Sequence, residues 1–253
     1  MENFSIIIPA RLASTRFPKK IIYDIFGLPM IEHVRRRALL IRGIKDVIVA
    51  TCDEEIFKIV KKYEGHVVMT SPDHINGTHR IAEAAKQVDS ENIILLQGDE
   101  PCIEPQTINK FIDFIGLKKS NFYNVICPIV NNEALYDISS VKCALENEYI
   151  KSCFRKSPYI TDENIQKQYV YKMLGIMNFK KNFLLNINKL VPSKLSEMES
   201  IEQLQLIDNH IDMRGFVIDK DYPSINNISD LEAMNIELEK KDQKQILSLI
   251  LNN

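Results

Sequence analysis

The stretch FSIIIPARLASTRFPKK, residues 4–20, contains an apolar run that breaks directly into a basic loop. Residues 4–10 have the character of a buried strand. The loop that follows carries four cations and no acid, namely Arg11, Arg16, Lys19 and Lys20. A solvated basic loop is one interpretation. Because ligands of open parallel sheets bind beyond the carboxyl ends of the strands, the position of the loop favours an anion-binding site.

The bulk composition is that of an ordinary globular chain of 253 residues, with 45% hydrophobic and 26% charged residues. A formal net charge of -2 argues against a general polyanion-binding surface, so we expect no nucleic-acid partner. Five cysteines without a C-x-x-C pair indicate free thiols in a reducing compartment. No signal peptide and no apolar run of membrane-spanning length is recognisable, so we expect a cytoplasmic protein without a membrane partner.

Apolar runs that fit strands alternate with helical patterns through the first half of the chain. The predicted strands are 4–10, 46–51, 66–70 and 92–97, and the predicted helices are 29–41, 53–63 and 105–119. Residues 71–88 are predicted as a Pro/Asn/Gly turn that leads into a further helix. Strands buried on both sides and separated by helices indicate a largely parallel sheet. The helical spacing of 29–41 places the run Arg35–Arg37 mostly on the solvent side.

The second half of the chain is less regular. We predict strands at 124–130, 140–147 and 214–220, a polar helix at 192–209, and a C-terminal helix at 229–252. In the C-terminal helix, Ser229 and Glu232 fit a capping box. No linker or repeat divides the chain, so we expect a single domain, 1–253, in which residues from about 128 to 190 form a possible subdomain over the edge of the sheet.

Polar side chains follow each of the four predicted strands and should meet at one rim of the sheet. A basic loop and the acidic pair Asp99 and Glu100 would face each other there, and a polyphosphate with Mg²⁺ satisfies both charges. An acid after a strand is often a helix cap, but the next helix begins later, which leaves Asp99 free to bind metal. The glycine patterns of dinucleotide and P-loop sites are absent.

Three motifs resemble those of the CMP-Kdo synthetases, or 3-deoxy-manno-octulosonate cytidylyltransferases, within the wider family of acid-sugar cytidylyltransferases. They are IIIPARLASTRFPKKII (6–22), MTSPDHINGTHR (69–80) and LLQGDEPCI (95–103). Weaker matches follow along nearly the whole chain, such as SSVKCALE, YKMLGI and SINNISDLEA. The resemblance implies an α/β, Rossmann-like nucleotidyltransferase fold, with a mostly parallel central sheet flanked by helices. It also implies a smaller inserted dimerisation or sugar-binding subdomain, and a homodimer.

The same resemblance implies that CTP and a sugar acid give a CMP-sugar and pyrophosphate, with Mg²⁺ as cofactor. It implies that Arg16, Lys20 and Asp99 are catalytic and that Asp99 binds the metal. The implied CTP-binding residues are Ala10, Arg11, Ser14, Arg16, Lys20, Asp73, Arg80 and Gln97. Lys19 stands where the family usually has glycine, so its charge has no implied role.

The chain departs from the family pattern in the half that handles the sugar. Lys156 stands in place of an arginine, Met173 in place of a histidine, and Asn226 in place of the second metal-binding aspartate. Glu202 and Gln203 match the family's sugar-contacting pair, although without the resemblance a solvent-facing helix explains them equally well. Sugar-binding residues are therefore expected at 156, 173, 202 and 203, and metal ligands at Asp99 and Asn226.

Three functions remain open on the sequence. The leading one is CMP transfer from CTP to the anomeric hydroxyl of Kdo or a Kdo-like 2-keto-3-deoxy acid sugar. The second is cytidylyl transfer to a different acid sugar, either amino-substituted or of sialic type. The third is a CTP-binding protein with weakened catalysis, which the loss of an aspartate at Asn226 would favour.

Overall fold

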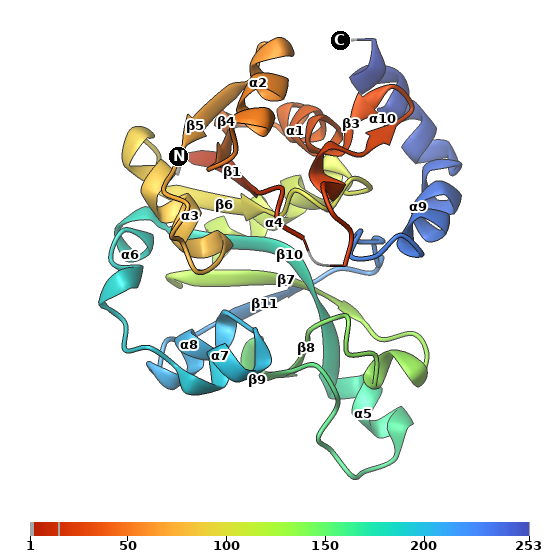
Figure 1. Cartoon of the computed structure of the whole chain (residues 1–253). Helices are drawn as coiled ribbons and strands as arrows, with labels where there is room; N and C mark the ends of the chain where they lie inside the picture. The colour runs from red at the N-terminus through yellow and green to blue at the C-terminus, as the bar shows by residue number, and fades with distance from the viewer. Residues whose placement is uncertain (1–2, 15, 253) are drawn as a thin grey trace.

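The computed structural model describes residues 3–14 and 16–252, which form one large mixed sheet with helices on both faces (Figure 1). In order across the sheet, its nine strands are β5 (His66–Met69), β4 (Ile44–Thr51), β1 (Phe4–Ala10), β6 (Asn92–Leu96), β10 (Val170–Lys180), β7 (Phe122–Pro128), β11 (Arg214–Val217), β9 (Tyr149–Phe154) and β8 (Lys142–Glu146). A small separate sheet pairs β2 (Asp24–Ile25) with β3 (Leu28–Pro29).

Ten α-helices lie within the described ranges, and none of them is long and apolar enough to cross a membrane. They are α1 (Met30–Leu39), α2 (Glu54–Lys62), α3 (Gly77–Ala84), α4 (Pro105–Leu117), α5 (Glu163–Tyr169), α6 (Lys181–Leu184), α7 (Lys194–Glu199), α8 (Gln203–Asp208), α9 (Asp230–Leu238) and α10 (Lys241–Leu251).

The strand β1 organises the parallel part of the sheet, because it pairs in parallel with both β4 and β6. All seven of its residues are buried. Ile6 and Ile8 belong to the core that includes residues of α1 and α4, whereas Ile7 belongs to the core that includes residues of α3 and α8. Alternate side chains therefore pack against opposite layers, as expected for a strand covered on both faces. This confirms the parallel arrangement predicted for the first four strands.

The long strand β10 enters the middle of the sheet, antiparallel to both β6 and β7. Its register against β7 shifts between Met173 and Met177, which marks a local irregularity in the segment that contains Gly175. The segment 128–190 therefore divides in space. The strands β8 and β9 extend one end of the sheet, and β10 joins its centre (Figure 1).

Two predicted helices are each broken into two, so those predictions are wrong. The region 192–209 forms α7 and α8, separated at Ser200, whose φ of 53° is left-handed and cannot continue a helix. The C-terminal region forms α9 and α10, and the side chain of Ser229 makes no capping hydrogen bond. Asp230 instead accepts hydrogen bonds from two backbone N–H groups that precede the helix.

The prediction that Arg35–Arg37 faces solvent is also wrong. Arg37 is fully buried, donates from Nη1 to the Ile103 carbonyl at 3.2 Å, and has its pKa lowered to about 10 by that burial. Arg35 is buried beside Glu32, with Nη2 2.6 Å from Oε2. The helix α10 packs against α1 here, and Arg36 donates to the carbonyl of Ile250 at 2.6 Å.

Candidate active site

The basic loop after β1 is tied to the neighbouring strand end. The backbone N–H of Leu12 donates to Asp53 Oδ2 at 2.9 Å, and Asp53 lies directly after β4. Within the loop, the N–H of Phe17 donates to Ser14 Oγ at 3.4 Å, and the Phe17 side chain is buried. The loop is therefore anchored at the rim where the parallel strands end, which is where the sequence places a ligand.

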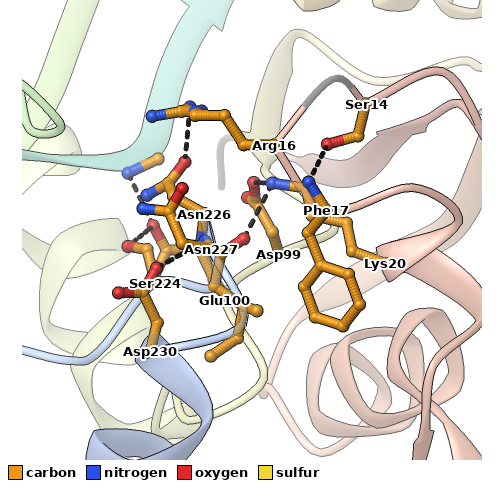
Figure 2. A network of polar contacts seen from close by, with 12 residues as sticks. Ser14, Arg16, Phe17, Lys20, Asp99, Glu100, Ser224, Asn226, Asn227 and Asp230 are labelled. Carbon is orange, nitrogen blue, oxygen red and sulfur yellow. Dashed lines mark hydrogen bonds and ion pairs between the residues drawn. The ribbon is translucent and has the colours of Figure 1, made fainter.

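Lys20 joins this loop to the acidic end of β6 (Figure 2). Its Nζ lies 2.5 Å from Asp99 Oδ2, and the two side chains are 13% and 22% exposed. The same Nζ donates to the carbonyl of Ile225 at 2.7 Å, and the N–H of Ile225 donates to the carbonyl of Asp99 at 2.9 Å. Three segments far apart in sequence therefore meet around one ion pair, and the predicted convergence of the basic loop with Asp99 is confirmed.

Arg16 and Asn226 form the second contact between the loop and this region. Arg16 Nη2 donates to Asn226 Oδ1 at 3.2 Å. The backbone N–H groups of Asn226 and Asn227 both donate to Asp230 Oδ2 at 2.7 Å, which fixes the turn that carries Asn226. The two oxygens that the sequence assigns to a metal, on Asp99 and Asn226, are thus each contacted by a cation from the basic loop.

Glu100 lies beneath this rim and is only 2% exposed. Its Oε1 accepts from the N–H of Gly175 at 3.1 Å and from Ser224 Oγ at 2.8 Å. Burial, together with the neighbouring charge of Asp99, raises the pKa of Glu100 to about 7. Glu100 therefore links the end of β6 to β10 and to the segment that leads to Asn226.

Lys19 has a different role from its neighbour Lys20. Its φ of 57° is left-handed, a conformation that glycine adopts at no steric cost. Its Nζ pairs with Glu55 Oε2 at 2.8 Å on the exposed start of α2. The left-handed backbone explains why a glycine suits this position. Because its Nζ pairs with Glu55, Lys19 takes no part in the Lys20–Asp99 contact.

The nucleotide-binding candidates nearest to this contact are Ala10, Arg11 and Gln97. Ala10 is buried at the end of β1, whereas Arg11 is exposed and makes no side-chain hydrogen bond or ion pair with the described residues. Gln97 lies between α3 and β10: a Cβ on Gly77 would meet its Nε2 at 3.4 Å, and a Cβ on Gly175 would meet its Cγ at 2.6 Å. These three side chains come to the same rim, and their contact with CTP stays a prediction.

Two further candidates lie around the start of α3. Arg80 is 4% exposed and donates from Nη1 to Thr70 Oγ1 at 2.6 Å, directly after β5. Asp73 is exposed, and its Oδ2 accepts from Ser71 Oγ at 3.2 Å. Both side chains are therefore engaged in local contacts at the end of β5, and their roles in binding CTP also stay predictions.

The predicted sugar-contacting pair is not a solvent-facing helix surface. Gln203 is 8% exposed and donates to Asn124 Oδ1 at 3.1 Å. Glu202 Oε2 accepts from the N–H of Thr78 at the start of α3, at 3.4 Å, and burial raises the pKa of Glu202. Both residues line one pocket together with Asn76 and Thr78.

The structure separates the two positions where the sugar half departs from the family pattern. Lys156 is exposed on the loop after β9, next to Arg155, which donates to the carbonyls of Glu199 and Ser200. Met173 is 7% exposed within the core, and its Sδ lies 3.6 Å from Cys153 Sγ. Within the described residues, the two side chains make no hydrogen bond or ion pair with each other, and their contact with a sugar stays a prediction.

Sequence reasoning missed the residues that hold the site together from behind. Ser224 and Gly175 reach Glu100 from segments that carry no local motif for this contact. Lys172 was missed as well, and its Nζ pairs with Asp221 at 2.8 Å beside the same segment.

The donor set around Asp99 fits Mg²⁺ only if the substrate contributes further oxygens. Within residues 3–14 and 16–252, no group of three or more His, Cys, Asp or Glu side chains could hold a metal ion. Asp99 offers a carboxylate and Asn226 an amide oxygen, and both already contact cationic nitrogens. Mg²⁺ commonly uses one or two carboxylates plus water and phosphate oxygens, so these two residues match that pattern.

Comparison with known proteins extends the resemblance over most of the chain. Residues 5–236 match the family model described as cytidylyltransferase. A 3-deoxy-manno-octulosonate cytidylyltransferase from Chlorobium phaeobacteroides is 36% identical over 233 residues, which cover 90% of this chain and 94% of the relative. An 8-amino-3,8-dideoxy-manno-octulosonate cytidylyltransferase from a Shewanella species is 36% identical over 212 residues, which cover 82% of this chain and 86% of the relative.

A solved structure gives the same result for the fold. It is a CMP:2-keto-3-deoxy-manno-octonic acid synthetase complexed with CTP, and it aligns with a TM-score of 0.85 at 31% identity. The alignment covers 93% of this chain and 98% of that chain. The resemblance drawn from the three sequence motifs and the nucleotidyltransferase fold that it implied are both confirmed.

Proposed function

Since this chain belongs to the cytidylyltransferase family, we propose that it transfers CMP from CTP to the anomeric hydroxyl of a 2-keto-3-deoxy acid sugar, Kdo or a close analogue, and releases pyrophosphate. The names of both relatives specify manno-octulosonate sugars, and the solved neighbour carries CTP. The structural observation that carries the proposal is the Lys20–Asp99 contact, which joins the basic loop after β1 to a carboxylate of the kind that binds a metal.

The reaction asks the protein mainly for alignment and charge neutralisation. The anomeric oxygen forms a bond to the α-phosphorus, the bond between the α-phosphorus and the bridging oxygen breaks, and the hydroxyl proton leaves to solvent. Arg11, Arg16 and Lys20 would hold the triphosphate oxygens, because all three cations lie on the loop after β1. Arg16 and Lys20 would then stabilise the charge that accumulates on the leaving pyrophosphate.

We include Mg²⁺ in the proposal, held by Asp99 and by Asn226 Oδ1. When bound, the ion would neutralise phosphate charge and favour departure of pyrophosphate. Asn226 supplies an oxygen without the negative charge of an aspartate, so Asp99 would be the main protein ligand. The weaker donor at 226 also supports the alternative of a CTP-binding protein with slow turnover.

A second acid sugar deserves a direct comparison with Kdo. Lys156 offers a point charge where a guanidinium would clamp a carboxylate with two parallel hydrogen bonds. Met173 is an apolar side chain where an imidazole would bind a hydroxyl. The Shewanella relative is named for an 8-amino sugar, which supports an amino-substituted acceptor as the second candidate.

The test is pyrophosphate release from CTP with a panel of sugar acids. Our proposal expects release with Kdo or its 8-amino analogue, and it expects calorimetric affinity for CTP well above that for ATP. A kcat/KM for Kdo of roughly 10⁴ M⁻¹s⁻¹ or more would identify an efficient Kdo enzyme and refute an altered pocket. CTP binding without release from any acceptor would favour the binding protein.

A homodimer is also part of the proposal. The loop after β9 and α5 expose an apolar tip that includes Ile160 at 102%, Tyr169 at 57% and Ile165 at 49% exposure. Such a surface favours burial against a second copy of the chain. Sedimentation should show a dimer that dissociates when Ile160→Asp and Ile165→Asp are combined. Leu117→Asp, on the exposed end of α4, should leave it intact.

We also propose a cytoplasmic location. All five cysteines are free thiols in the structure, and four of them are buried, which suits a reducing compartment. A nucleoside triphosphate substrate is made and used in the cytoplasm. Fractionation of cells that express the protein tests this, and recovery in a membrane or exported fraction would contradict it.

A further inference from the structure

We propose that Glu100, acting through Ser224, is a positioning residue that holds Asn226 opposite Asp99. The inference rests on the proposed function, because these two side chains are the proposed metal ligands. Glu100 itself lies below the rim and is 2% exposed, so it does not need to touch the metal or the substrate. Its contribution would be to set the separation between the two oxygens that bind the metal, on Asp99 and Asn226.

Two hydrogen bonds connect the Asp99–Glu100 turn to the segment before Asn226. Ser224 Oγ donates to Glu100 Oε1 at 2.8 Å, and the N–H of Ile225 donates to the Asp99 carbonyl at 2.9 Å. Asn226 follows immediately, with its side chain at Arg16 (Figure 2). Apart from Lys20, which contacts both Asp99 and the carbonyl of Ile225, one backbone bond and one side-chain bond therefore set the position of Asn226 relative to Asp99. Glu100 accepts the side-chain bond.

The Glu100 carboxyl is itself held in one orientation by β10. The N–H of Gly175 donates to Oε1 at 3.1 Å, so this single oxygen serves both β10 and Ser224. A Cβ on Gly175 would lie 2.9 Å from Oε1 and 2.6 Å from Gln97 Cγ, so β10 approaches too closely for any side chain at that position. The close approach leaves Glu100 little room to move.

The opposite side of the turn has its own anchor. Asp230 accepts from the N–H groups of Asn226 and Asn227, and it does so without Glu100. Loss of the Glu100 acceptor should therefore shift the turn that carries Asn226 and leave the turn itself formed. The expected defect is in metal-assisted CTP binding, with the metal-free affinity for CTP preserved.

The experiment compares calorimetric CTP affinity with Mn²⁺ and with EDTA. We expect Mn²⁺ to tighten binding by the wild-type protein by at least about tenfold. Glu100→Leu should lose most of that gain and keep its metal-free affinity within about twofold. Glu100→Gln keeps an acceptor oxygen and should retain the gain. Ser224→Ala should lose part of the gain, and Ser224→Thr, which keeps the hydroxyl, should restore it.

Glu104→Leu is the matched control. Glu104 is a nearby acid whose Oε1 lies 2.5 Å from Lys220 Nζ. It takes no part in the hydrogen bonds that join Glu100 to Ser224 and Gly175. This variant should lower thermal stability and leave the ratio of the two CTP affinities unchanged. If Glu100→Leu does not fold, the pair Ser224→Ala and Ser224→Thr carries the test, because Ser224 is only part-buried.

Three results would overturn the positioning role. One is a folded Glu100→Leu variant, or a Ser224→Ala variant, in which the ratio of CTP affinity with Mn²⁺ to CTP affinity with EDTA is that of the wild type. Another is a loss in Glu100→Gln as large as in Glu100→Leu, which would mean that the charge matters and not the acceptor. The third is a wild-type protein whose affinity for CTP is the same with Mn²⁺ as with EDTA. Failure of the proposed function would look different, since the wild-type protein would then form no CMP-sugar at all.

Discussion

Lys20 and Asp99 form an ion pair, with Nζ 2.5 Å from Oδ2, within the site proposed for the metal and the triphosphate. Lys20 also holds the carbonyl of Ile225 at 2.7 Å. In the proposed mechanism, the ammonium would therefore compete with a metal ion for Asp99 as long as no nucleotide is bound. Phosphate oxygens would attract Lys20 away from Asp99 and free the carboxylate at the moment when a metal is needed.

Lys20→Met should raise the affinity for Mn²⁺ in the absence of nucleotide, by about tenfold, because it removes the competing cation. It should also weaken CTP binding, because the triphosphate loses a partner. Electron paramagnetic resonance of free Mn²⁺ measures the first effect and calorimetry the second. Lys19→Met is the control, since Lys19 pairs with Glu55. Unchanged Mn²⁺ affinity in Lys20→Met would show that the ion pair does not guard Asp99.

Asn226→Asp should lower the Mg²⁺ concentration that gives half-maximal CTP binding, by several-fold. The substitution adds a negative charge at a proposed metal ligand, whose oxygen lies 3.2 Å from Arg16 Nη2. Asn227→Asp adds the same charge one residue further along and should have little effect. Equal responses from the two variants would show that general charge, and not a ligand at 226, sets the metal requirement.

Lys19→Gly should change the free energy of unfolding by less than about 1 kcal/mol and leave turnover unaltered. Glycine relieves a left-handed backbone that costs a lysine roughly 1 kcal/mol. The lost Glu55 ion pair is exposed and contributes at most about 1 kcal/mol. Glu55→Gln measures the second effect alone. A large loss of turnover in Lys19→Gly would return Lys19 to the active site.

His33 should make the protein less stable as the pH falls from about 6.5 to about 4. It is fully buried, its Nε2 lies 2.7 Å from the Ile25 carbonyl, and burial together with Arg37 and Arg36 lowers its pKa to about 4. The unfolded chain, with a pKa near 6.5, therefore binds the proton first, and folding stability is lost on acidification. At about pH 5 the loss should be about 2 kcal/mol relative to pH 8.

His33→Gln keeps an N–H donor and removes the titration, so urea unfolding of this variant should lose less stability between pH 8 and pH 5. Other acids titrate in the same range, so the difference between variant and wild type is the quantity to compare. His66→Gln, at an exposed position, should follow the wild-type curve. Identical slopes for His33→Gln and wild type would contradict a buried neutral His33.

The sequence was informative where local patterns determine the structure. The strand predicted at residues 4–10 has the same bounds as the observed strand β1. Because the parallel strands end at one rim of the sheet, Lys20 and Asp99 meet there, as predicted. The antiparallel entry of β10 between β6 and β7 depends on pairing over long sequence distances, and no local pattern specifies it. The same holds for Glu100, whose partners Gly175 and Ser224 come from distant segments.

The burial of several polar side chains could not be predicted from the sequence either. Arg37 was expected in solvent because periodicity defines one apolar face of a helix and says nothing of what covers the opposite face. Here the carbonyl of Ile103 receives its guanidinium, and α10 packs nearby against α1. Glu202 and Gln203 were equally compatible with a solvated helix until Thr78 and Asn124 appeared as their partners.

The central claim is that CMP is joined to an acid sugar at the Lys20–Asp99 site, and mass spectrometry of the reaction product tests it most directly. Wild-type protein with CTP, Mg²⁺ and Kdo or 8-amino-Kdo should form the CMP-sugar. Folded Asp99→Asn should form it far more slowly, because loss of the ligand charge removes several kcal/mol of transition-state stabilisation. No CMP-sugar from the wild-type protein, or near-normal formation by Asp99→Asn with excess Mg²⁺, would contradict this account.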